Sequence, residues 1–125
     1  MSRIYFVIVS LFVCQFTKAQ TKEWKELTHF HEIMSATFHP AEEKNLQPLK
    51  DSAQILVLRA KEWKQAVVPQ GYNAAIIKPL LGQLELEAEL LYKAVRSKES
   101  DSSLTKKITQ LHNTFHKIAE KCREH

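Results

Sequence analysis

The spacing of the apolar residues most constrains how this chain can fold. Over residues 24–38, 46–67, 77–95 and 104–122, core-type side chains recur in alternating steps of three and four. Such steps place them on one face of an α-helix. They also allow neighbouring helices to pack at a shallow crossing angle. The sequence therefore predicts four amphipathic helices.

Helix-breaking and capping residues separate the four stretches. His39 and Pro40 predict that the first helix ends there and that Pro40 opens the second. Asn73, at the end of the turn VPQGYN, is a predicted N-cap, and Asp101 or Ser102 is predicted to cap the fourth helix. Because the loops are short, we predict an all-α, up-down-up-down antiparallel four-helix bundle.

Residues 1–19 have the features of a signal peptide. A short basic start precedes the apolar run IYFVIVSLFV, which is too short to span a bilayer, and Thr17 and Ala19 are the small residues of a cleavage site. We expect cleavage after Ala19 and a bundle domain over residues 20–125. Its expected location is periplasmic or secreted, without a membrane association after cleavage. The alternative is a retained membrane anchor.

Cysteine content and charge narrow the possible functions. Removal of the signal peptide removes Cys14 and leaves Cys122, so no internal disulfide is expected. The formal net charge of +4 is small, and basic and acidic residues are interspersed. Because the sequence lacks a basic stripe interleaved with aromatic residues, we expect no nucleic-acid partner.

A histidine interrupts the apolar stripe of the first helix. His31 falls between Leu27 and Met34 in that stripe, so we expect its side chain to point into the bundle. His29 lies two residues earlier, about 160° around a helix, and is expected to face solvent. The two histidines are therefore not predicted to chelate one ion together.

A second histidine pair lies on the fourth helix. His112 and His116 are four residues apart, beside the stripe residue Phe115, so they share a face that flanks the core. That spacing allows two imidazoles to bind one metal ion. Counting residues from the loops puts His31 and His112 within roughly 3 Å of the same level of the bundle.

These positions define a candidate metal site between the first and fourth helices. Its predicted ligands are His31, Met34, His39, His112 and His116. His39 is the most remote, since it would lie roughly 10 Å or more from His112 at the top of the bundle. Glu42 and Glu43 are expected to stabilise the start of the second helix instead. The alternative for His31 and Met34 is a structural role in the core.

The arrangement resembles the four-helix-bundle cytochromes of the b type and the c-prime type, and small periplasmic metal-binding bundles. The resemblance implies a haem b clamped by Met34 and either His112 or His116. It does not extend to covalent haem attachment, because the sequence contains no C-x-x-C-H motif.

We expect a periplasmic protein that binds a transition metal ion for buffering, storage or sensing, and not an enzyme. Imidazole ligands suit copper, zinc or nickel, and Met34 would favour copper. No base–nucleophile pair or glycine-rich phosphate loop points to catalysis. The alternatives are a b-type electron-transfer haem protein and a cofactor-free structural or chaperone-like bundle.

Overall fold

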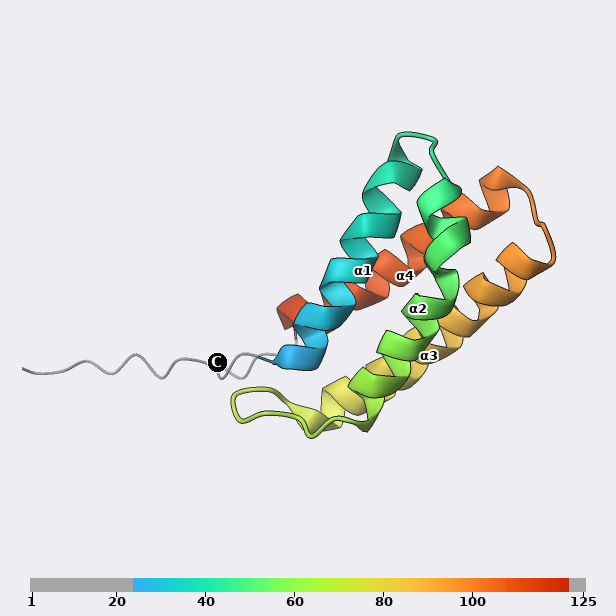
Figure 1. The fold of residues 1–125 in the computed structure, drawn as a ribbon. Helices are drawn as coiled ribbons and strands as arrows, with labels where there is room; N and C mark the ends of the chain where they lie inside the picture. The colour runs from blue at the N-terminus through green and yellow to red at the C-terminus, as the bar shows by residue number, and fades with distance from the viewer. Residues whose placement is uncertain (1–23, 122–125) are drawn as a thin grey trace, which may run out of the picture.

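The structure is a computed structural model that describes residues 24–121, with side chains to residue 120. It contains helices α1 (Lys25–Glu42), α2 (Gln47–Gln65), α3 (Ala74–Arg96) and α4 (Asp101–Lys121). Each helix packs against the next, and α4 also packs against α1 (Figure 1). The predicted all-α four-helix bundle is confirmed. The expected signal peptide and Cys122 lie outside the described residues, and no helix among those described is long and apolar enough to cross a membrane.

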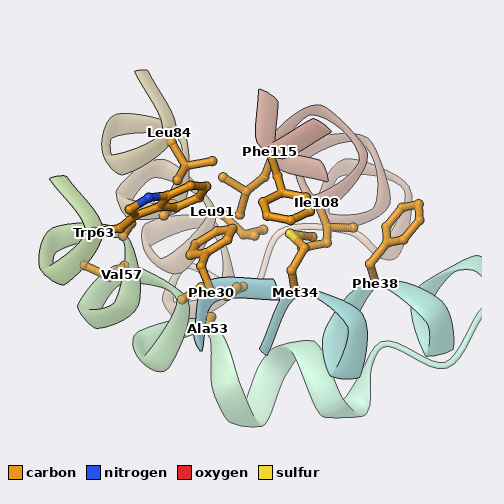
Figure 2. Packing of buried hydrophobic residues seen from close by; sticks show 14 of the residues in the cluster. Phe30, Met34, Phe38, Ala53, Val57, Trp63, Leu84, Leu91, Ile108 and Phe115 are labelled. Atoms are coloured by element: carbon orange, nitrogen blue, oxygen red, sulfur yellow. The ribbon is translucent and has the colours of Figure 1, made fainter. Parts of the chain in front are cut away.

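The core forms where the apolar stripes of the four helices meet. Trp63 lies among other aromatic residues, with its ring centroid 5.5 Å from that of Phe30 and 5.9 Å from that of Phe115. Figure 2 shows these rings packed beside aliphatic side chains from α3 and α4. The predicted stripes of α2, α3 and α4 supply the buried residues Leu49, Ala53, Leu56, Ala60, Trp63, Ile77, Leu81, Leu84, Ala88, Leu91, Leu104, Ile108, Leu111, Phe115 and Ile118.

The inward face of α1 differs from the predicted one. Met34 and Phe38 of the predicted stripe are buried, and Trp24 is buried just before the helix with an extended backbone (φ −91°, ψ 98°). Between them the helix buries Phe30, and His31 is exposed. The prediction that His31 points into the core is therefore wrong.

The first helix also runs further than predicted, through Pro40 to Glu42. Ala41 is buried by this extra half-turn. The N–H groups of Lys44 and Asn45 donate to the carbonyls of Ala41 and Pro40 at 3.0 and 2.9 Å, and these bonds satisfy the end of the helix. Because α2 begins only at residue 47, Glu42 and Glu43 lie at the end of α1. The expectation that they stabilise the start of the second helix is therefore wrong.

The caps of the last two helices involve short polar side chains. The N–H of Ala75 donates to the side chain of Asn73 at 3.1 Å, as predicted. At α4 the N–H of Ser103 donates to Ser100 Oγ at 3.1 Å, so this cap lies one residue before the predicted Asp101.

Candidate metal centre

Four histidines gather where α1 and α4 meet. His31 and His39 come from α1, and His112 and His116 come from α4; we call these four residues the histidine cluster. The α1 pair is exposed and the α4 pair is half-buried. The cluster therefore lies at the surface of the bundle and not on its axis.

The two histidines of α4 face one another. Their Nε2 atoms are 3.0 Å apart, and their ring centroids are 4.3 Å apart with the planes at 79°. On its other side, His116 Nδ1 lies 2.9 Å from Glu120 Oε1. The two Nε2 atoms are thus within hydrogen-bonding distance of each other, on the shared helix face that the four-residue spacing predicts.

Aromatic stacking fixes the level of each histidine along the bundle. The ring of His112 stacks on Phe38, with centroids 3.8 Å apart and planes at 12°. His31 stacks on Phe115 at 5.4 Å, also at 12°. His112 therefore lies beside Phe38, and His31 lies beside Phe115, which is three residues or about 4.5 Å along α4 from His112.

The upper end of α1 lies close enough to α4 for its charges to act on His112. The pKa of His112 is lowered, first by burial and then by the positive charge of His116. Glu42 opposes this shift and raises the pKa, while His39 and His31 lower it further. All these groups belong to one electrostatic environment, and the stack of His112 on Phe38 places His112 beside the residue that precedes His39.

The α1 side chains of this environment interact with their own helix. His39 Nδ1 lies 3.5 Å from Glu42 Oε2, and the two side chains are 68% and 56% exposed. His31 Nε2 lies 3.3 Å from Ser35 Oγ. Because these side chains are exposed, their torsion angles can change without disturbing the core.

Met34 lies apart from the imidazoles. Its side chain is only 1% exposed, and Figure 2 shows its sulfur beside Ile108 and Phe115, inside the bundle. The sulfur is thus enclosed by side chains of the core. This packing does not fit a haem clamped between Met34 and His112 or His116.

The structure brings two of the five predicted ligands, His112 and His116, into contact with each other. Within residues 24–120, no group of three or more His, Cys, Asp or Glu side chains is arranged to hold a metal ion. His112 and His116 are paired, whereas His31 and His39 would need new side-chain rotamers to join them. His29 lines a separate surface depression with Lys25 and Glu32.

Two residues of the site, Phe38 and Glu120, are not among those that the sequence predicts for it. Phe38 was assigned to packing only, yet its ring supports His112. Glu120 lies four residues after His116, a spacing that brings helical side chains together and could have identified it.

Comparisons with known protein families, curated proteins and solved structures find no match to this chain.

Proposed function

We propose that this protein binds a divalent transition metal ion through His112 and His116, with a further ligand from α1. The observation that carries the proposal is the 3.0 Å separation of the two Nε2 atoms. Two imidazole nitrogens bound to one ion at about 2.0–2.1 Å lie roughly 2.9 Å apart at a right angle and roughly 3.4 Å apart in a tetrahedron. The observed separation falls within that range, so the two nitrogens need not move apart to accept an ion, although the proton between them must leave Nε2.

The further ligand comes from the exposed side chains of α1. Glu42 and His39 both act electrostatically on His112, and both have exposed side chains that can rotate. A carboxylate or an imidazole is a suitable ligand for the ions that imidazoles bind. His31, on the other flank of the cluster, is the alternative donor.

The donor set favours copper(II), followed by zinc or nickel. Copper(II) is bound most tightly among the divalent ions in sites of nitrogen and oxygen. An angle near 90° between the two imidazole nitrogens also suits its tetragonal geometry. Met34 does not contribute to this preference, because its sulfur is directed into the core.

The proposed role is metal buffering, storage or sensing, in the periplasm or outside the cell. An exported location follows from the signal peptide expected at residues 1–19. Metal binding would use the imidazole nitrogens of the cluster and the carboxylate of Glu42 beside it.

Calorimetric titration with Cu²⁺, Zn²⁺ and Ni²⁺ tests the proposal. We expect one ion per chain, with Cu²⁺ the tightest, and a loss of at least about 100-fold in affinity when His112 and His116 are both changed to Ala, because two ligands are removed. His29→Ala is the matched control, since it removes an imidazole of α1 outside the cluster. Equal affinity of the double variant and the parent for all three ions would refute the site.

A further inference from the structure

We infer that Glu120 is a positioning residue that fixes the tautomer of His116 and keeps its Nε2 lone pair directed toward His112. The inference deepens the proposed metal site and rests on it for its purpose. Its geometric basis is the 2.9 Å contact between His116 Nδ1 and Glu120 Oε1.

The hydrogen-bonding capacity of the two groups determines the tautomer. An ionised carboxylate only accepts hydrogen bonds, so the 2.9 Å contact requires the proton on His116 Nδ1. In the neutral ring the other nitrogen, Nε2, then carries a lone pair. Without metal that lone pair accepts a hydrogen bond from His112 Nε2–H at 3.0 Å, and with metal it becomes a ligand.

The exposure of Glu120 argues against a purely structural role. Its side chain is 67% exposed, so it adds little to the core. Its contact with Nδ1 lies on the opposite edge of the His116 ring from the Nε2 atom that faces His112, which is the geometry that an orienting carboxylate needs.

Carboxylates that hold the second nitrogen of a metal-binding histidine are a recurrent feature of metal sites. They fix the ring and make the ligating nitrogen more basic, and their loss typically weakens metal binding by about 10- to 100-fold. Glu120 has the geometry for this effect on His116. The preceding residues of the same helix supply both histidines, so the whole arrangement fits on one face of α4.

Nitrogen-15 NMR of the metal-free protein tests the tautomer directly. At about pH 8.5, where ordinary imidazoles are neutral, we expect His116 to be protonated on Nδ1 in the parent. In Glu120→Ala it should shift toward the Nε2–H form, while Glu120→Gln, which retains an acceptor oxygen, should keep much of the Nδ1–H form. Glu32→Ala, which removes an exposed glutamate of α1, should leave His116 unchanged.

Copper titration of the same variants provides the second measurement. We expect Glu120→Ala to bind Cu²⁺ about 10- to 100-fold more weakly than the parent, with Glu120→Gln between them and Glu32→Ala equal to the parent. A parent His116 protonated on Nε2, or a tautomer that Glu120→Ala does not change, would overturn the inference. Absence of Cu²⁺ binding to the parent, with the NMR shift as expected, would refute the proposed metal site and leave the tautomer assignment intact.

Discussion

The edge between α1 and α4 and the edge between α2 and α3 use their polar residues differently. Across α2 and α3, Lys61 pairs with Glu89 at 3.7 Å and Lys64 pairs with Glu85 at 3.3 Å. These pairs join the two helices with complementary charges at the surface.

Between α1 and α4 the polar contacts of the histidine cluster run along each helix. His31 contacts Ser35 on α1, and His112 contacts His116 on α4. The links across this edge are aromatic stacks, such as that of Phe38 on His112. At one edge the charged side chains are thus paired with opposite charges across two helices, whereas at the other edge two helices present imidazole groups. The proposed metal ion would bind at this second edge.

The largest expected effect follows from Phe38→Ala, which removes the stack between α1 and α4. Phe38 is 8% exposed, and loss of a buried Phe side chain should lower the free energy of unfolding by about 3 kcal/mol. It should also weaken Cu²⁺ binding, because His112 loses the ring that supports it. Urea unfolding and calorimetry measure the two effects. Phe38→Leu is the control, and a Phe38→Ala variant that unfolds like the parent would contradict the packing described for this edge.

The next effect is the pH dependence of metal binding. A histidine must be deprotonated to bind a metal ion, so the affinity for Cu²⁺ should fall by at least about tenfold between pH 7.5 and pH 5.5. Titrations at several pH values in a non-chelating buffer measure it. An affinity that is constant over this range would exclude imidazole ligands.

The lowered pKa of His112 fixes the sign of a related effect on the metal-free protein. Because burial and His116 lower this pKa from 6.5, the unfolded chain takes up a proton at His112 more readily than the folded protein. The lowered pKa of His112 therefore contributes to the free energy of unfolding. That contribution is complete above pH 6.5 and is lost as the pH falls through the folded-state pKa of His112. His112→Asn should therefore unfold with a smaller pH dependence than the parent, and an unchanged dependence would show that His112 is not the group responsible.

A smaller effect is expected for Met34→Leu. The change approximately conserves volume in the core, so the free energy of unfolding should change by less than about 1.5 kcal/mol. Cu²⁺ affinity should stay the same, since the sulfur lies inside the bundle. A marked loss of Cu²⁺ or Cu⁺ binding, measured by competition with a chelating indicator, would instead place Met34 among the ligands.

The smallest effect is expected at the α2–α3 edge. Replacement of Lys61 and Lys64 by Ala removes two exposed ion pairs, each worth about 0.5 kcal/mol or less. Metal affinity should not change. If this variant weakened metal binding as much as loss of the α4 histidines does, the contrast between the two edges would be wrong.

The fold was predictable because the stripes of α2, α3 and α4 keep their phase through most of each helix. They contain core residues such as Leu56, Leu84 and Leu111, although Val67, predicted at the end of the α2 stripe, lies beyond the helix and is 88% exposed. For α1 the predicted stripe correctly contains Met34 and Phe38, but the helix buries Phe30 where the stripe has His31. Steps of three and of four are both compatible with one helical face, so the spacing alone does not decide between neighbouring positions.

The candidate site was predictable where it depended on one helix. The pairing of His112 with His116 follows from their spacing alone. Which α1 residues lie beside these two histidines depends on how α1 and α4 pack. Neither the shift of α1 along α4 nor the continuation of α1 beyond Pro40 follows from the residues of one segment alone. The contact between Phe38 and His112 could therefore not be obtained by counting residues.

Anomalous diffraction from crystals of the protein grown with Cu²⁺ tests the central claim most directly. The account predicts one strong anomalous peak at the α1–α4 edge, about 2.0–2.1 Å from Nε2 of both His112 and His116, with His39, Glu42 or His31 as a further ligand. Bound copper that contacts neither His112 nor His116, or no ordered copper in the crystal, would contradict it.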